Sequence, residues 1–213
     1  KAIYDLAVKY DVMVIEDSPY FELRYSGEYI PSIKSMDTTG HVIFAGSMSK
    51  ILAPGLRVGF AIANKEVLAK LTIGKQVEDM NNAGYTQSIV SEYLKKYDLD
   101  AHIDECCDLY RRKRDVMLKA LDEKMSEFAS WEAPDGGLFV WITLPEGVSG
   151  DALTQHLIDT QKLIVTPGSS FRPDMQDSNC IRINFSIPTE DQIVEYIDLL
   201  ANGVKHFMSN KIG

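Results

Sequence analysis

The spacing of apolar residues predicts helices alternating with short strands in the first part of the chain. Residues 1–10 carry apolar side chains at helical spacing, and three continuous apolar runs follow as expected strands. These runs are Val12–Ile15, Val42–Ala45 and Val58–Ala63. A run without alternation, as at Val12–Ile15, is typical of a parallel strand that is covered on both faces. The pattern therefore predicts an α/β fold for this part.

The remainder of the chain has the pattern of an α+β domain that follows a long amphipathic helix. Helices Lys65–Leu71 and Thr86–Tyr97 still belong to the first part. The elements expected after them are helix Ala101–Met125, strand Leu138–Leu144, helix Gly150–Thr160, strands Leu163–Val165 and Cys180–Phe185, and helix Thr189–Met208. Thr189 is expected to cap the last helix, with Gln192 completing a capping box. We predict a sheet-forming part over residues 1–97 and a smaller α+β domain over residues 98–213.

The composition narrows the range of functions by exclusion. The chain has 213 residues, of which 45% are hydrophobic, so it can bury a substantial core. A net charge of −9 argues against broad binding to nucleic-acid backbones, and no apolar segment approaches the length of a membrane span. Three cysteines, two of them adjacent, argue against a disulfide framework and fit a reducing cytosol. No Cys/His spacing is typical of a metal site.

A lysine stands between two of the expected strands, which is unusual because lysine side chains are mostly exposed. Lys50 follows Ser47 and Ser49 closely, and Arg57 comes soon after it. This cluster suits an anionic ligand bearing a group that an amine can attack. Taken alone, the same residues also fit a solvated surface turn.

Asp17 comes directly after the first expected strand. Ligands of open parallel sheets bind beyond the carboxyl ends of the strands. Since Asp17 and Lys50 both follow such an end, we expect them to converge on one crevice. Taken alone, Asp17 also fits a loop-initiating aspartate before Ser18 and Pro19.

The lysine stretch resembles the cofactor-lysine motif of class I/II aminotransferases, which are fold-type I enzymes that use pyridoxal 5'-phosphate. The resemblance rests on Ser47-x-Ser49-Lys50 followed by Pro54-Gly55-x-Arg57-x-Gly59, and on the pair Asp17-x-x-Tyr20. It implies that Lys50 is the catalytic lysine, which holds the cofactor covalently and moves the substrate proton.

The resemblance also implies roles for the other residues of the two motifs. Asp17 is expected to keep the pyridine nitrogen protonated, and Tyr20 to contact the ring phenolate oxygen. Ser47, Ser49 and Arg57 are expected to bind the phosphate.

Arg182, in the expected strand Cys180–Phe185, resembles the arginine that binds the substrate carboxylate in this family. Its alternative interpretation is an exposed arginine on a half-buried strand. The implied reaction transfers an amino group between an amino acid and a 2-oxo acid. The segments Gly136–Trp141 and Val165–Phe171 resemble those of the aminotransferases that include the 2-aminoadipate and kynurenine enzymes.

The resemblance further implies that the chain is the C-terminal portion of such an enzyme. The family's N-terminal arm and the first half of its large domain precede the matching segments, and the chain starts at Lys1 inside a helical pattern. Residues 1–97 would then be the C-terminal part of the cofactor-binding large domain, and residues 98–213 the small C-terminal domain. We expect weak or no activity from the isolated chain, and a cytoplasmic homodimer for the intact protein.

Two other functions use the same residues. A β-lyase, decarboxylase or cyclising enzyme on the same scaffold needs the same lysine. Alternatively, the chain is the effector domain of a regulator resembling the MocR type, with a DNA-binding segment upstream of Lys1. A binding module without a cofactor is disfavoured, because several separate positions fit one cofactor.

Overall fold

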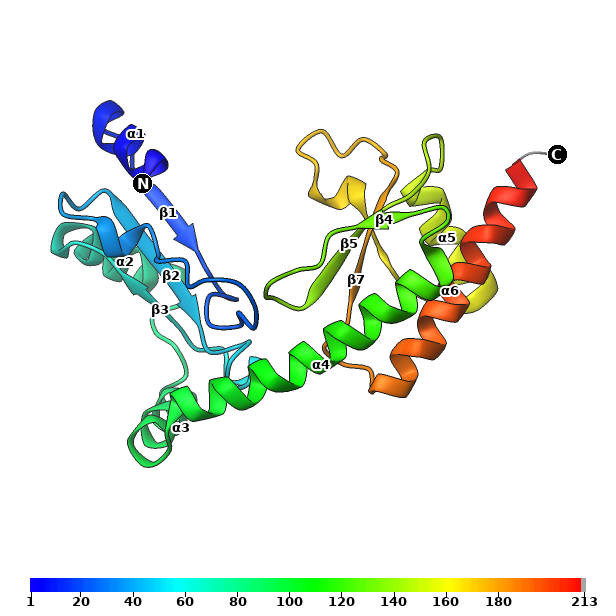
Figure 1. Cartoon of the computed structure of the whole chain (residues 1–213). Coiled ribbons are helices and arrows are strands. Elements are labelled where there is room, and N and C mark those ends of the chain that lie inside the picture. The colour runs from blue at the N-terminus through cyan, green and yellow to red at the C-terminus, as the bar shows by residue number, and fades with distance from the viewer. Residues whose placement is uncertain (212–213) are drawn as a thin grey trace. The chain divides into compact units, whose positions relative to one another are not determined.

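The structure is a computed structural model that describes residues 1–211 (Figure 1). The chain forms two compact units, one spanning Lys1–Cys107 and one beginning at Asp108. The division falls inside α4 (Leu99–Met125). Each unit is described by itself below. Within the described residues, none of the helices combines the length and hydropathy needed to cross a membrane.

The first unit is an α/β arrangement built on a three-stranded sheet with the order β1-β2-β3. Its elements are α1 (Ala2–Tyr10), β1 (Val14–Asp17), η1 (Lys34–Met36), β2 (Val42–Ser47), η2 (Pro54–Leu56), β3 (Gly59–Ile62), α2 (Lys65–Glu78) and α3 (Gly84–Lys96). β1 and β2 are parallel, whereas β3 is antiparallel to β2. The predicted mixed α/β class is confirmed.

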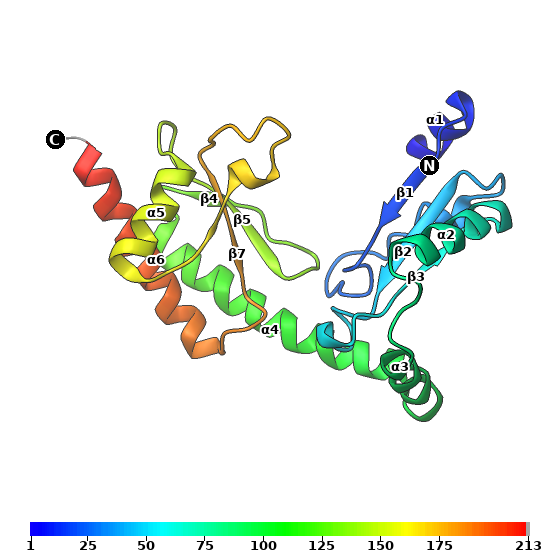
Figure 2. The same ribbon diagram turned by 180° about the vertical axis from the view of Figure 1, so that it is seen from behind.

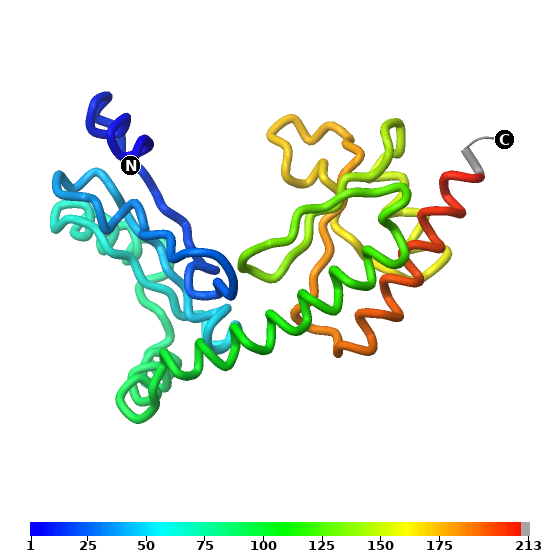
Figure 3. Tube along the Cα trace, viewed as in Figure 1, coloured from blue at the N-terminus to red at the C-terminus, as the bar shows by residue number. Residues whose placement is uncertain are grey.

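The connection between β1 and β2 is a long loop, which Figure 3 traces as residues 18–41. Two carboxylates fix it. Glu16 accepts hydrogen bonds from the backbone amides of Ile33 (2.8 Å) and Lys34 (3.0 Å). Asp37 accepts from the amide of Gly40 at 2.7 Å and from the Lys34 ammonium at 2.8 Å. Glu16 therefore ties Ile33 and Lys34 to β1, and Asp37, which also accepts from the Val42 amide at 3.0 Å, ties the end of the loop to the start of β2.

The Asp37 side chain is fully buried. Burial by itself raises the pKa of this carboxyl. Hydrogen bonds from Lys34 and from the backbone amides of Val42, Gly40 and Thr39 outweigh burial and hold the pKa of Asp37 well below its usual range. Asp37 is therefore an ionised residue in the interior of the loop.

The apolar run predicted as a doubly covered strand is only partly a strand. β1 begins at Val14, because α1 ends in a left-handed cap at Asp11 and the Val12 amide bonds back to the Ala7 carbonyl. Ile15 is 70% exposed, so one face of the strand is open. The prediction that both faces are covered is wrong for the described residues, which leave Ile15 on one face of β1 exposed.

The elements after β2 also differ from prediction. β3 is shorter than Val58–Ala63, and all four of its residues are exposed. α2 continues to Glu78 instead of ending at Leu71, because no helix-breaking residue occurs before Asp79 and Gly74 is tolerated. Asn64 caps α2 by accepting from the amide of Val67 at 2.8 Å.

The second unit is α+β and contains a four-stranded antiparallel sheet with the order β4-β5-β7-β6. Its strands are β4 (Ser130–Trp131), β5 (Phe139–Thr143), β6 (Thr166–Pro167) and β7 (Cys180–Asn184). Its other elements are α5 (Gly150–Gln161), η3 (Gly168–Phe171) and α6 (Glu190–Lys211). α5 and α6 lie side by side, as Figure 1 and Figure 2 both show.

The sheet of the second unit buries alternate residues. Val140 and Ile142 of β5 and Ile181 and Ile183 of β7 are buried, as expected for strands that cover a core with one face. The residues between them, including Trp141 and Arg182, lie on the opposite face. This second face carries the arginine predicted to bind a carboxylate.

The start of α6 confirms the predicted capping box. The Thr189 hydroxyl accepts from the Gln192 amide at 3.3 Å, and the Gln192 side chain accepts from the Thr189 amide at 3.0 Å. The predicted strand Leu163–Val165 is wrong, since the strand is β6 at Thr166–Pro167. Leu163 instead completes the exit from α5, where its amide donates to the Leu157 carbonyl.

Candidate functional site

The carboxyl ends of β1 and β2 carry the predicted polar residues of the first unit. The two strands are parallel, and Asp17 is in register with Ala45. Ser47 is the last residue of β2. The amide of Ser18 donates to the Ala45 carbonyl at 3.0 Å, which extends the pairing past the strand end. Asp17 and Ser47 therefore come out at the same edge of the sheet, as the sequence predicted.

The segment between β2 and β3 is a closed loop that presents Lys50. Its ends are joined by the Met48 amide, which donates to the Val58 carbonyl at 3.0 Å. The Met48 carbonyl accepts from the amides of Leu52 and Ala53. Ile51, the loop residue that follows Lys50, has a buried side chain. These contacts fix the backbone on both sides of Lys50 without using its amine.

The Lys50 amine lies above the ring of Tyr20, with 5.7 Å between Nζ and the ring centroid. This distance is within the range of a cation–π contact. Lys50 is half-buried, and so is Tyr20. The lysine of the second strand end and the tyrosine that follows the first strand are thus neighbours, although 30 positions separate them along the chain.

The two serines and the arginine of the loop are also linked. The Ser47 hydroxyl accepts from the Ser49 amide at 3.1 Å. Arg57 donates through Nη1 to the Ser49 hydroxyl at 3.5 Å and to the Pro54 carbonyl at 3.2 Å. Arg57 has a left-handed backbone with φ of 53°, a conformation that residues other than glycine rarely adopt. In this conformation the guanidinium reaches Ser49 and the Pro54 carbonyl.

The donor set of this loop has a definite chemistry. A primary amine, two hydroxyls and a guanidinium lie on one loop, and a carboxylate ends the neighbouring strand. The hydroxyls and the guanidinium are donors for a phosphate or similar anion. The amine is a nucleophile for a carbonyl carbon. We find no group of three or more His, Cys, Asp or Glu side chains arranged for a metal within residues 1–211.

Arg182 belongs to the second unit, on the face of β7 opposite the helices. It pairs with Trp141 of β5 on one side and with Thr166 of β6 on the other. Its Nε is buried and has no hydrogen-bond partner among the described residues. The strand fixes the base of the side chain, and no hydrogen bond at Nε restrains the guanidinium.

Two aromatic rings hold the guanidinium of Arg182 instead. Its Cζ lies 3.8 Å from the ring centroid of Phe139 and 4.4 Å from that of Phe171. Phe171 is in turn in edge contact with Trp141, at 5.3 Å between centroids. Sequence reasoning missed this clamp. The available signal was Phe139 and Trp141 on the same face of a strand expected near the arginine.

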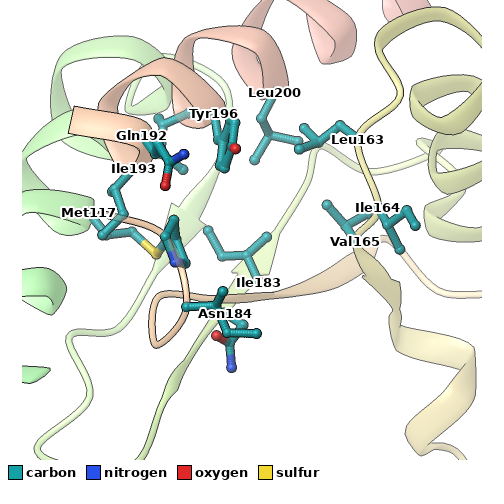
Figure 4. Close-up of a pocket in the computed structure, with 13 residues that line it drawn as sticks. Met117, Leu163, Ile164, Val165, Ile183, Asn184, Gln192, Ile193, Tyr196 and Leu200 are labelled. Atoms are coloured by element: carbon teal, nitrogen blue, oxygen red, sulfur yellow. The ribbon is translucent and has the colours of Figure 1, made fainter. Parts of the chain in front are cut away.

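A separate cavity of about 460 Å³ lies on the helix side of the second unit (Figure 4). Side chains from α6, from the end of β7 and from the segment before β6 surround it. Asn184 and Gln192 line it, but both accept local hydrogen bonds, from Ser186 and Thr189 respectively. The lining contains no charged side chain, so the cavity is not suited to a phosphate or carboxylate.

Comparison with known proteins assigns these features to a family. The profile of the family "Aminotransferase class I and II" matches residues 1–200. The chain is 40% identical to an aromatic-amino-acid aminotransferase of Thermococcus litoralis, over 98% of this chain and 50% of the relative. It is 33% identical to the kynurenine/alpha-aminoadipate aminotransferase of Rattus norvegicus, over 96% of this chain and 49% of that protein. The chain therefore spans about half the length of the curated relatives it matches.

Solved structures of aminotransferases are similar to this chain over nearly its whole length and over about half of their own. A multiple substrate aminotransferase from Thermococcus profundus has a TM-score of 0.92 and 38% identity, covering 98% of this chain and 52% of that one. The alpha-aminoadipate aminotransferase of Thermus thermophilus, solved with N-(5'-phosphopyridoxyl)-L-leucine, has a TM-score of 0.92 and 30% identity, covering 98% and 54%. The transcriptional regulator NorG of Staphylococcus aureus is 28% identical over 91% of this chain and 43% of its own length.

Proposed function

Because the chain belongs to the class I and II aminotransferases, we propose that the whole protein transfers an amino group between an amino acid and a 2-oxo acid. The family resemblance predicted from the lysine motif is thus confirmed. The cofactor is pyridoxal 5'-phosphate, in keeping with the phosphopyridoxyl adduct of the Thermus thermophilus relative. When bound, it supplies the electron sink that stabilises a carbanion at the substrate α-carbon.

The residues of the first unit fit this group. The observation that carries the proposal is the position of the Lys50 amine, 5.7 Å from the centroid of the Tyr20 ring, beside a loop whose serines and arginine are linked. We assign covalent attachment to Lys50 and phosphate binding to Ser47, Ser49 and Arg57.

The remaining roles follow from the chemistry of the side chains. Asp17 supplies the carboxylate for the protonated pyridine nitrogen, and Tyr20 a hydroxyl for the ring oxygen. With the cofactor bound, the Lys50 amine would act as the base that accepts the proton of the substrate α-carbon and as the acid that delivers it to the aldehyde carbon of the cofactor. Arg182 binds the substrate carboxylate, with its guanidinium held by Phe139 and Phe171.

We further propose that the substrates include aromatic amino acids and that the whole protein is a cytoplasmic homodimer. The aromatic class is supported by the exposed rings of Trp141 and Phe171 beside Arg182, and by the aromatic-amino-acid enzyme of Thermococcus litoralis. The proposed preference for aromatic substrates is tested by comparing kcat/KM for phenylalanine with kcat/KM for 2-aminoadipate.

In the domain assignment we propose, residues 1–97 belong to the large domain and residues 98–213 to the small one. We expect weak or no transaminase activity from this chain alone.

The decisive experiment replaces Lys50 by alanine in the intact protein. Borohydride reduction followed by peptide mass spectrometry should find the pyridoxyl mass on the Lys50 peptide of the wild type and nowhere in Lys50→Ala. Lys65→Ala, at an exposed lysine on α2, is the matched control and should retain the label. A label that persists in Lys50→Ala would refute the assignment.

The match to NorG supports a second candidate, a regulator that uses this fold to sense a ligand. It predicts specific DNA binding by the intact protein that changes with pyridoxal 5'-phosphate or an amino acid. A mobility-shift assay against the DNA flanking its own gene separates the two candidates. Turnover of an amino acid without DNA binding favours the enzyme.

A further inference from the structure

Two histidines that are far apart in the sequence meet on the surface of the second unit. His156 belongs to α5 and His206 to α6, and 50 positions separate them along the chain. Nε2 of His156 and Nδ1 of His206 lie 3.4 Å apart, and the two ring centroids lie 5.2 Å apart. In such a pair one imidazole donates a hydrogen bond and the other accepts it. The amino-group transfer proposed above uses neither ring.

The packing of α5 against α6 holds the two rings at this separation. The helices lie side by side in Figure 1 and Figure 2, and Leu157 of α5 is fully buried. Gly203 of α6 permits the close approach, because a Cβ at this position would clash with the Leu157 side chain. Leu157 is next to His156, and Gly203 is three residues before His206. Phe207 also packs on the His156 ring, at 5.4 Å between centroids. The helix contact therefore positions the pair before any ligand binds.

The separation of the two nitrogens matches that of two ligands on one metal ion. Tetrahedral zinc binds imidazole nitrogen at about 2.0–2.1 Å, which places two such nitrogens about 3.3–3.4 Å from each other. For both facing nitrogens to coordinate, the proton between them must move to the far nitrogen of its own ring, and the rings must rotate slightly. His156 is half-buried and His206 is exposed, so an ion can reach both rings from solvent.

We propose that His156 and His206 bind a divalent transition-metal ion of the zinc class, with water in the remaining coordination positions. The ion links α5 to α6 and stabilises their packing, because it binds the pair only when the helices are together. No third His, Cys, Asp or Glu completes the group within residues 1–211. Since structural zinc sites have four protein ligands and catalytic sites three, this ion is exchangeable. Imidazole suits Zn²⁺ and Ni²⁺, whereas Mg²⁺ and Ca²⁺ prefer oxygen ligands.

A second pair of metal-ligating side chains lies on α4 and is the rival site. Nε2 of His102 and Sγ of Cys106 are 3.6 Å apart, on successive turns of the helix. A metal binds the thiolate form of cysteine. Burial, with a smaller contribution from the charge of Glu105, raises the pKa of the Cys106 thiol and disfavours that form. The metal site is therefore assigned to the histidine pair, and His102 provides the matched control.

The test uses the intact protein with its cofactor bound, and zinc chloride as the probe. Isothermal titration calorimetry should find a zinc site in the wild type whose affinity falls about tenfold or more in His156→Asn and in His206→Asn, because each variant removes one ligand. His102→Asn should retain the affinity of the wild type. Zinc should also slow amide hydrogen exchange in α5 and α6 of the wild type and in neither variant of the pair. Magnesium chloride at the same concentration should have no effect.

Equal zinc affinity in the wild type and in both variants of the pair would overturn the proposal. So would a loss of affinity in His102→Asn alone, because the site would then be the pair on α4. Circular dichroism checks that each variant is folded.

A measurement on the wild type decides the question even if a variant misfolds. Diethyl pyrocarbonate modifies accessible imidazoles, so zinc should protect His156 and His206 from this reagent, as peptide mass spectrometry can measure. Unchanged modification of both residues would contradict the proposal. Zinc binding by a protein without transaminase activity would contradict the proposed function and leave this inference intact.

Discussion

The guanidinium of Arg182 lies over the ring of Phe139, with 3.8 Å between Cζ and the ring centroid. Phe171 holds the same guanidinium at 4.4 Å. This contact orients the side chain through the π-faces and uses none of its N–H donors. The donors of Arg182 are thereby left for a planar, bidentate ligand such as a carboxylate.

Replacing Phe139 by leucine in the intact protein should raise KM for the amino-acid substrate with little change in kcat. A cation–π contact of this kind contributes about 0.5–2 kcal/mol, which corresponds to a rise of about 2- to 30-fold. The arginine binds the carboxylate equally in the substrate and in the transition state. Weaker binding therefore raises KM and leaves kcat nearly unchanged. Phe128→Leu, which removes the contact with Lys205 at 5.5 Å, should leave KM unchanged. An unaltered KM in Phe139→Leu would show that the ring does not position Arg182.

Replacing Arg57 by glycine should separate backbone strain from phosphate binding. The left-handed backbone at Arg57 costs about 1 kcal/mol, which glycine avoids. We expect the free energy of unfolding of the chain to stay constant or to rise by up to about 1 kcal/mol, as measured by urea denaturation. Cofactor affinity of the intact protein should fall about tenfold or more, because a charged hydrogen-bond donor is lost. Arg57→Ala, which keeps the strain, should lose both affinity and stability, and unchanged affinity in both variants would remove Arg57 from the phosphate site.

Asp37 should make the stability of the chain depend on pH. The pKa of Asp37 is lower in the folded state than in the unfolded state. Its contribution to the free energy of unfolding is therefore present above the unfolded-state pKa of about 3.9 and is lost as the pH falls through the folded-state pKa. Asp37→Asn should cost about 2–3 kcal/mol at pH 7, because the half-buried Lys34 ammonium loses its ionic partner. The difference between wild type and variant should shrink below pH 4 in urea denaturation. Asp11→Asn, at a carboxylate that is almost fully exposed, should show no comparable effect.

Two glycines should respond in opposite directions to alanine. A Cβ at Gly150 would lie 2.5 Å from the Cys180 carbonyl oxygen and 2.7 Å from that of Ser178. Since both atoms belong to the backbone and cannot rotate away, Gly150→Ala should destabilise the second unit by about 2–4 kcal/mol. A Cβ at Gly74 meets nothing within 4 Å, so Gly74→Ala should stabilise α2 by about 1 kcal/mol. Thermal unfolding followed by circular dichroism measures both.

The features that sequence predicted well depend on local pattern. The capping box of Thr189 and Gln192 needs only four consecutive residues, and the structure contains both of its hydrogen bonds. The strand ends that carry Asp17 and Ser47 were predicted from apolar runs followed by polar residues, and the parallel register brings them to one edge. Here the local pattern and the sheet topology agree.

The features that sequence missed depend on residues far apart in the chain. The clamp on Arg182 joins β5, η3 and β7, and no spacing in the sequence reveals which strands will be neighbours. Leu163–Val165 has the composition of a strand, but α5 ends in a left-handed residue at Lys162 and pairing starts only at Thr166. In both examples, tertiary contacts determine the structure and override the local preference of the sequence.

The parallel pairing of β1 with β2 has a consequence for the order of assembly. Val14 must find Val42 across the whole loop between the strands, and contacts between distant residues form slowly during folding. Glu16 and Asp37 shorten this search, because Glu16 holds Ile33 and Lys34 against β1 and Asp37 holds the start of β2. We expect the refolding rate, more than the final stability, to be sensitive to these two carboxylates. The edge that carries Asp17 and Ser47 is then completed late, and the Lys50 loop acquires its neighbours at that step.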